Sequence, residues 1–176
     1  MIVAAVVTQE GNDKRQLVPM IKEVRENMGK MPERVSADAG YFSEPQLTNP
    51  SLRGVDVYVP PDRQKHDEPL KQVEMTVESV ASDKCAEVMR KKLKTEQGIK
   101  EYKKRKQTVE PVFGQIKECR GFRRFSLRGL EKVTAEWSIV CLSHNLLKLF
   151  KSGFLLSGGI KGEIGIRGVV NRVIWA

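Results

Sequence analysis

The feature that most constrains the fold of this chain is the alternation of apolar, β-branched runs with helical segments in its first third. A helix separates the first two runs, and a short helix or a pair of turns separates the last two. Parallel strands require crossover connections of this kind, so the order predicts an α/β fold with a parallel sheet. The three strand-like runs are "IVAAVVTQ" (2–9), "ERVSADAGY" (33–41) and "VDVYVPP" (55–61).

The remaining sequence predicts further helices and a segment outside the core. We expect Asn12 or Asp13 to cap a first helix that runs to about Met28 and stops at Gly29. Basic helical sequence fills 85–107, and an amphipathic helix fills 130–150. The glycine-studded end predicts no helix; it either pairs as strands or forms a tail. We divide the chain into 1–61 (core), 62–107 (polar and basic insertion or linker with a helix), 108–151 (C-terminal helices) and 152–176 (tail).

The net charge of +9 is unevenly distributed along the chain. Residues 1–83 hold 10 Lys and Arg against 14 Asp and Glu, whereas residues 84–132 hold 16 against 6. A basic block of this density favours a polyanion such as nucleic acid as partner, although lysines also solvate exposed helices. Three separated cysteines indicate reduced thiols in a cytosolic protein, and no apolar run is long enough to span a membrane.

The stretch "VSADAGYFSE" (35–44) places a carboxylate, Asp38, at the end of a predicted strand and before two small residues. A second acid, Glu110, lies in "TVEPVFGQIK" (108–117). Pro111 removes a helical hydrogen bond, so we expect a helix to begin near Thr108, with Thr108 as N-cap and Glu110 in the first turn at the positive end of the helix dipole.

Two carboxylates from separate elements suit Mg²⁺, which keeps several waters and needs few protein ligands. In a two-metal site such acids hold ions that activate an attacking oxygen and stabilise a leaving one. The alternative is structural, because turn aspartates and helix-start glutamates are common. Spacing alone leaves both interpretations open.

Two stretches together resemble the C-terminal half of an insertion-sequence DDE transposase of the group with a Tyr–Arg–Glu–Lys signature. They are "ADAGYFSE" and "YKKRKQTVEPVFGQIKECRGFRRFSLRGLEKVTAEWSIVCLSHNLLKL". The resemblance runs from about Ile2 to Phe150. It implies a ribonuclease-H-like catalytic domain in which Asp, Asp and Glu bind two Mg²⁺ or Mn²⁺ ions. These ions drive cleavage of a DNA strand by water and joining by a DNA 3′ hydroxyl.

Carried over by motif, Asp38 resembles the second catalytic acid and metal ligand, and Glu110 the third. Tyr102 and Arg105 resemble the signature tyrosine and arginine, and Lys117 resembles the lysine that contacts DNA near the transposon end. The resemblance makes these three residues, together with Lys106, candidates for DNA binding. Four residues separate Arg105 from Glu110, where the family has three. Either Lys106 therefore takes the role of the arginine or the register shifts by one, with the offset absorbed in a non-helical segment before Pro111.

The resemblance also implies that the first catalytic Asp lies on a strand upstream of Ile2, at the centre of the sheet, between the strands at 2–9 and 33–41. Asp13 is no substitute, because it follows the strand. We therefore expect an incomplete ribonuclease-H-like domain that lacks its first strands and the first acid, truncated at the N-terminus, with apolar strand edges exposed.

The prediction is a transposase fragment acting in DNA transposition, with activity of this chain alone left uncertain. The alternatives are a non-catalytic DNA-binding fragment, a relic that does not fold stably, and a basic structural or RNA-associated protein. Expected partners are double-stranded DNA at transposon ends and a full-length transposase or a second copy, in the cytoplasm of a bacterium and on its nucleoid. Further candidates for phosphate contact, with Phe122 and Phe125 between them for apolar docking, are Arg120, Arg123, Arg124 and Arg128. His144 is expected to be a hydrogen-bonded helix histidine rather than a ligand.

Overall fold

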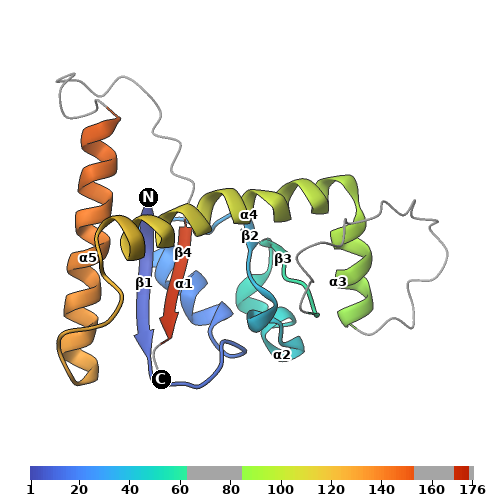
Figure 1. Cartoon of the computed structure of the whole chain (residues 1–176). Coiled ribbons are helices and arrows are strands. Elements are labelled where there is room, and N and C mark those ends of the chain that lie inside the picture. The colour runs from blue at the N-terminus through green and yellow to red at the C-terminus, as the bar shows by residue number, and fades with distance from the viewer. Residues whose placement is uncertain (63–84, 153–168, 175–176) are drawn as a thin grey trace.

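The computed structural model describes residues 1–62 and 85–152 and the backbone of 169–174. A mixture of helices and small sheets makes up this part of the chain (Figure 1). The elements, in chain order, are β1 (Ile2–Thr8), α1 (Leu17–Met28), β2 (Arg34–Ser36), the 3-10 turn η1 (Ala39–Tyr41), α2 (Glu44–Leu47), the 3-10 turn η2 (Pro50–Leu52), β3 (Asp56–Tyr58), α3 (Cys85–Lys94), α4 (Glu96–Gly114), the π-helical turn η3 (Gln115–Cys119), α5 (Leu130–Lys151) and β4 (Val169–Ile174).

The first strand and helix form where the sequence predicts them. Helix α1 ends at Gly29, whose φ of 69° is the left-handed conformation that glycine adopts without a steric penalty. Its N-terminus differs from the prediction, because the N-cap residue is Gln16 and makes no side-chain capping bond. Asp13 lies one turn earlier, where its carbonyl accepts a hydrogen bond from the Gln16 amide at 3.0 Å. The expected cap at Asn12 or Asp13 is therefore wrong.

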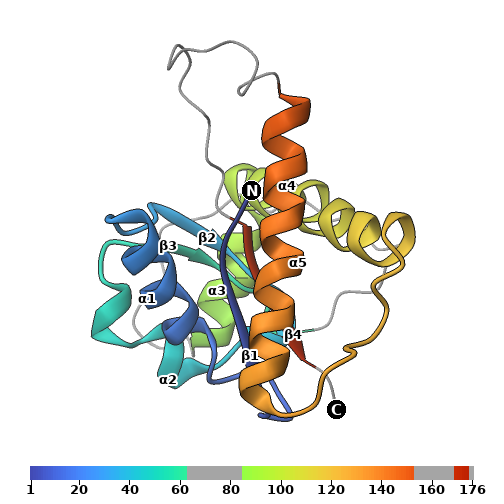
Figure 2. The same cartoon turned by 90° about the vertical axis from the view of Figure 1, so that its left-hand side faces the viewer.

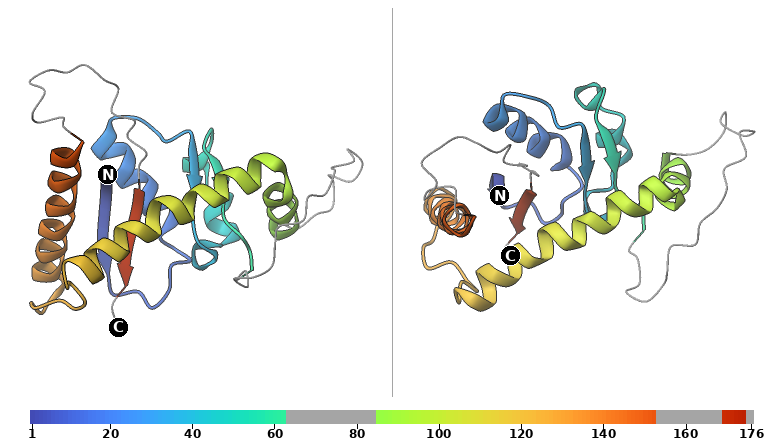
Figure 3. Two further views of the ribbon diagram at one scale, coloured as in Figure 1. Left: turned by 45° about the horizontal axis from the view of Figure 1, so that its top comes forward. Right: turned by 90° about the horizontal axis from the view of Figure 1, so that it is seen from above.

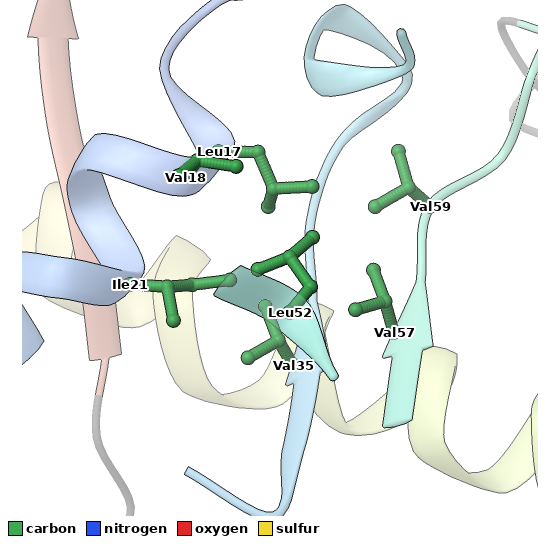
Figure 4. Close-up of a cluster of buried hydrophobic side chains, with 7 residues drawn as sticks. All are labelled: Leu17, Val18, Ile21, Val35, Leu52, Val57 and Val59. Carbon is green, nitrogen blue, oxygen red and sulfur yellow. The ribbon is translucent and has the colours of Figure 1, made fainter. Parts of the chain in front are cut away.

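Strands β2 and β3 pair in parallel, as the alternating order predicts, and α1 covers them. Figure 4 shows the side chains of α1 directed toward those of the two strands. This cluster is built almost entirely from aliphatic side chains, and burying each one contributes about 1.5–3 kcal/mol to folding before entropy costs. Its buried members are Leu17, Val18, Ile21, Val35, Leu52, Val57 and Val59.

Strand β1 pairs in parallel with β4 rather than with β2. Figures 1 and 3 show β4 on the side of β1 that faces β2. The expectation that this edge of β1 is exposed is thus wrong in the described structure, because β4 forms hydrogen bonds with the backbone groups there. Of the two possibilities for the chain end, strand pairing is the one observed for Val169–Ile174.

Helices α3 and α4 meet at Thr95, whose hydroxyl accepts a hydrogen bond from the Gly98 amide at 3.0 Å and caps α4. A Cβ at Gly98 would lie 2.1 Å from the carbonyl oxygen of Lys92, so only glycine permits this close approach. From there α4 runs without a break across both strand pairs (Figure 3). The predicted helix start at Thr108 is therefore wrong.

The continuity of α4 has a physical explanation in the packing beyond Pro111. A proline inside a helix costs about 3 kcal/mol, because it lacks an N–H donor and crowds the preceding turn. Val112 and Ile116 follow it and are 5% and 1% exposed, and their burial offsets this cost. The Thr108 hydroxyl donates to the carbonyl of Lys104 at 2.6 Å and does not cap a helix start.

Helix α5 packs along β1 (Figure 2). The Asn145 side chain fixes this contact, since it accepts from the Ile2 amide at 2.8 Å and donates to the Ile2 carbonyl at 2.7 Å. Trp137, only 2% exposed, packs between α5, β1 and the end of α4. In the described part of the chain, no helix has the length and apolar character needed to cross a membrane.

Candidate functional site

Asp38 follows the carboxyl end of β2, as the sequence predicts. The β2–β3 pairing extends to Ala37, whose amide donates to the carbonyl of Tyr58 at 3.0 Å. Asp38 then turns the chain: its Oδ1 accepts from the Ala39 amide at 2.7 Å and caps η1. The side chain remains 64% exposed, so the carboxylate can reach a ligand from solvent.

Helix α4 brings Tyr102 and Arg105 to this strand end. Tyr102 is 5% exposed and packs with Tyr58, Met89 and Leu93, which anchors this part of α4 beside β3. The Arg105 guanidinium lies 5.1 Å from the centre of the Tyr102 ring, within the range of a cation–π contact.

The other contact of Arg105 is with Asp38. Its Nη1 lies 4.0 Å from Oδ2 of Asp38, which is the outer limit of an ion pair. The Arg105 Nε is buried and has no hydrogen-bond partner among the described residues. The arginine therefore retains donor capacity next to the exposed carboxylate.

The pKa of the Tyr102 phenol shows which charges gather here. Burial raises this pKa above its usual value, the positive charge of Arg105 opposes the rise, and the carboxylates of Asp38 and Glu110 add to it. Both acids consequently lie within electrostatic reach of one phenol, although 72 positions separate them in sequence. We call Asp38, Tyr102, Arg105 and Glu110 the acid–tyrosine cluster.

Glu110 reaches the cluster in a different way from the one predicted. It is exposed and lies near the C-terminal end of α4, not in a first turn, so the helix dipole does not stabilise its charge. No non-helical segment separates it from Arg105, and the idea that such a segment absorbs the spacing offset is wrong. Arg105 is the residue that faces Asp38; the side chain of Lys106 lies outside what the structure describes.

The donor chemistry of the cluster fits a hard divalent cation. Asp38 and Glu110 supply carboxylate oxygens and are exposed, so water and substrate phosphate can complete a shell of the kind that Mg²⁺ prefers. Among the described residues, no three His, Cys, Asp or Glu side chains gather to hold a metal ion. The two acids are thus the ligands that these residues can offer at this site.

The remaining DNA-binding candidates lie beyond Glu110. Lys117 is exposed on η3, with its Nζ 5.9 Å from the centre of the Phe113 ring. Arg124 and Arg128 are exposed, and Arg123 pairs with Glu118 at 2.6 Å on the surface, where such pairs contribute little to stability. Arg120 differs, because it is half-buried and its Nη1 lacks a hydrogen-bond partner among the described residues.

Phe122 and Phe125 do not form the expected apolar docking surface. Their ring centroids lie 6.1 and 6.3 Å from that of Trp137, and both side chains are partly buried against the core cluster that contains Trp137. Glu136, which sequence reasoning missed, accepts hydrogen bonds from the amides of Ser126 and Leu127. These contacts tie residues 126 and 127 to α5, and no local pattern in the sequence marks Glu136 for that role.

Comparison with protein families identifies this chain. Residues 62–150, 89 of the 176 residues, match the family described as "Transposase DDE domain". The chain therefore belongs to this family. The match includes Tyr102, Arg105, Glu110 and Lys117, whereas Asp38 precedes it. No curated protein and no solved structure matches the chain significantly.

Membership of the family indicates a function in DNA transposition, with DNA as substrate, and the family typically uses a divalent metal. The predicted transposase membership is confirmed at this level. The roles assigned to individual residues stay predictions.

Proposed function

We propose that this chain is the catalytic part of a DDE transposase that cleaves and joins DNA strands at transposon ends. The observation that carries this proposal is the acid–tyrosine cluster, in which the charges of a strand-end aspartate and a helical glutamate both raise the pKa of one buried tyrosine, while Arg105 lies 4.0 Å from the aspartate. The parallel β2–β3 pair with an acid at its carboxyl end supports a ribonuclease-H-like origin for residues 1–61.

In this proposal Asp38 and Glu110 hold Mg²⁺ or Mn²⁺. When bound, the metal supplies activation of the attacking oxygen and stabilisation of the leaving one. Arg105 positions Asp38, because its guanidinium is held over the Tyr102 ring and its Nη1 faces the carboxylate. The phenol of Tyr102 is protonated near neutral pH even at the usual tyrosine pKa of about 10, and burial raises that pKa further, so the hydroxyl can donate a hydrogen bond inside the cluster.

DNA binding in the proposal falls to the basic block of residues 84–132. Lys117 and the exposed arginines Arg123, Arg124 and Arg128 lie on the stretch that follows Glu110, where they can meet phosphates on either side of a cleaved bond. A polyanionic substrate of this kind places the protein on chromosomal DNA in the bacterial cytoplasm. A full-length transposase or a second copy is the proposed protein partner.

The test is a nicking assay on plasmid DNA that carries the ends of the element, with Mg²⁺ or Mn²⁺. The wild type tests whether Asp38 and Glu110 suffice for metal-dependent nicking without the family's first acid, and Asp38→Asn and Glu110→Gln should each lower that nicking by more than about 10- to 100-fold. Loss of a group that merely orients a metal ligand already costs that much. Glu87→Gln, an exposed acid on α3, is the matched control and should nick like the wild type.

A second candidate is a DNA-binding protein without nuclease activity. The exposed cations Arg123, Arg124 and Arg128 favour it, since contacts between such cations and phosphates do not require a bound metal. It predicts DNA binding that weakens steeply with salt, with no metal-dependent nicks. Nicking that survives in both acid variants would refute the catalytic assignment of Asp38 and Glu110.

A further inference from the structure

A cavity of about 440 Å³ lies between the end of α4, η3 and α5. Three basic side chains, Arg120, Lys148 and Lys151, line it, together with the amide side chains of Gln107 and Gln115. None of the described residues that line it carries a carboxylate. We call this space the cationic cavity.

His144 lines the same cavity and is buried, at 3% exposed. Within the described residues, neither of its ring nitrogens has a hydrogen-bond partner, and the buried Nη1 of Arg120 has none either. The expectation of a hydrogen-bonded histidine is therefore wrong here. Buried polar groups left without partners cost about 1–3 kcal/mol each, so their presence together calls for a ligand that accepts hydrogen bonds.

The electrostatics of His144 agree with an anionic ligand. Burial lowers the pKa of its imidazole, and the charges of Arg120 from the turn after η3, of Lys148 from α5 and of the Met1 amino group lower it further. The ring is consequently neutral near pH 7, with one N–H donor and cations around it. An anion in the cavity would satisfy this donor and offset the repulsion between the cations.

We propose that the cationic cavity binds a phosphate group, held by Arg120, His144 and Lys148. A phosphate offers several acceptor oxygens and negative charge, which matches a guanidinium, an imidazole N–H and an ammonium. The inference rests on the proposed function in one respect, namely that the phosphate belongs to DNA. Gln107 and Pro111 line the cavity from the turns of α4 that carry Glu110, so the cavity adjoins the helix segment that bears one acid of the acid–tyrosine cluster.

The first test uses inorganic phosphate and needs no DNA. The chain has two histidines, so ¹⁵N-labelled imidazole signals are assigned by comparison with His144→Phe, which keeps a ring of similar volume. We expect phosphate to shift the His144 signals in a saturable manner and to leave the His66 signals unchanged. Arg120→Gln should abolish the shift, with Lys148→Gln as a second variant if that protein does not fold. Arg25→Gln, the same change at an exposed position of α1, should leave it intact.

The second test measures binding of a short fluorescein-labelled DNA duplex by anisotropy at several salt concentrations. Arg120→Gln should make the slope of log K against log [salt] shallower by roughly 0.9, the value for one lost phosphate contact. Arg25→Gln serves again as the control.

The outcomes separate this inference from the proposed function. A phosphate-dependent His144 shift with an unchanged DNA slope in Arg120→Gln supports the phosphate site and assigns it to free phosphate. If phosphate does not shift the His144 signals and Arg120→Gln leaves the DNA slope unchanged, the cavity is not a phosphate site, even where the nicking assay succeeds. A wild type that shifts with phosphate but shows neither nicking nor DNA binding would refute the proposed function and leave the cavity assignment standing.

Discussion

Two polar regions lie along α4, and they differ in how their charges are satisfied. In the acid–tyrosine cluster, the Asp38 carboxylate accepts a backbone hydrogen bond and faces Arg105, while its other surface is open to solvent. In the cationic cavity, Arg120 and His144 hold buried nitrogens without partners in the described structure. The first region is suited to a cation and the second to an anion, which are the two charges that a metal-dependent reaction on DNA must hold side by side.

The two regions also rest on different cores. The acid–tyrosine cluster is anchored by Tyr102 against Tyr58, Met89 and Leu93. The cationic cavity lies beside an aromatic cluster in which Trp137 contacts Phe122 and Phe125. Damage to one core should therefore affect its own region first, and three variants test this separation.

The largest effect is expected from Trp137→Ala. Removing this side chain, 2% exposed, should lower the free energy of unfolding by about 3–5 kcal/mol in chemical denaturation. Backbone hydrogen exchange should increase more in α5 and residues 112–125 than in β2 and β3. The matched change is Leu142→Ala, at a residue of the same helix that is 56% exposed. Its free energy of unfolding should stay within about 0.5 kcal/mol of the wild-type value. An equal loss of protection in both regions would show that they form one cooperative unit.

An intermediate effect is expected from Arg105→Gln, which acts on the acid–tyrosine cluster alone. The charge of Arg105 lowers the pKa of Tyr102, so its removal should raise that pKa further above the usual tyrosine value. Spectrophotometric titration, with Tyr102→Phe to assign the transition, measures this change. Nicking should fall by about 10- to 100-fold, as for other groups that orient a metal ligand.

Arg105→Lys keeps the charge and is the control for this variant. The pKa of Tyr102 in Arg105→Lys should lie closer to the wild-type value than the pKa in Arg105→Gln does. An identical tyrosine titration in the wild type and in Arg105→Gln would mean that Arg105 does not face Tyr102 in solution.

The smallest effect is expected from Glu101→Gln, which weakens the tie between α4 and β2. The Glu101 carboxylate lies 3.1 Å from Arg34 and 2.6 Å from Lys104, and these cations hold its pKa below the usual value. A lowered folded-state pKa contributes stability above the unfolded value near 4.5, and this stability is lost as the pH falls through the folded value. We expect Glu101→Gln to cost about 0.2–1 kcal/mol at pH 7.

The difference between this variant and the wild type should shrink as the pH falls below about 4.5, because the wild-type carboxylate then takes up a proton, first in the unfolded state and at lower pH in the folded state. Thermal unfolding at pH 7 and pH 3 measures the difference. A constant gap between the two proteins at both pH values would assign the effect to packing and not to charge.

The sequence by itself determined the local elements and the residues of the candidate site. Apolar periodicity predicts β1, α1 and α5, because alternation or helical spacing of buried side chains is decided within a few turns of chain. Asp38 at a strand end follows from the same pattern. The motif that contains Tyr102, Arg105 and Glu110 also belongs to the sequence, which is why the family could be predicted from it.

Only the tertiary structure decided how these parts meet. Pro111 lies inside α4 because Val112 and Ile116 are buried against distant residues, and no rule about proline alone anticipates that gain. Strand β4 pairs with β1 although almost the whole length of the sequence separates the two strands. His144 and Arg120 line one cavity because α5 packs along β1 and beside the end of α4. Such contacts depend on burial between elements far apart in sequence, and local periodicity carries no record of them.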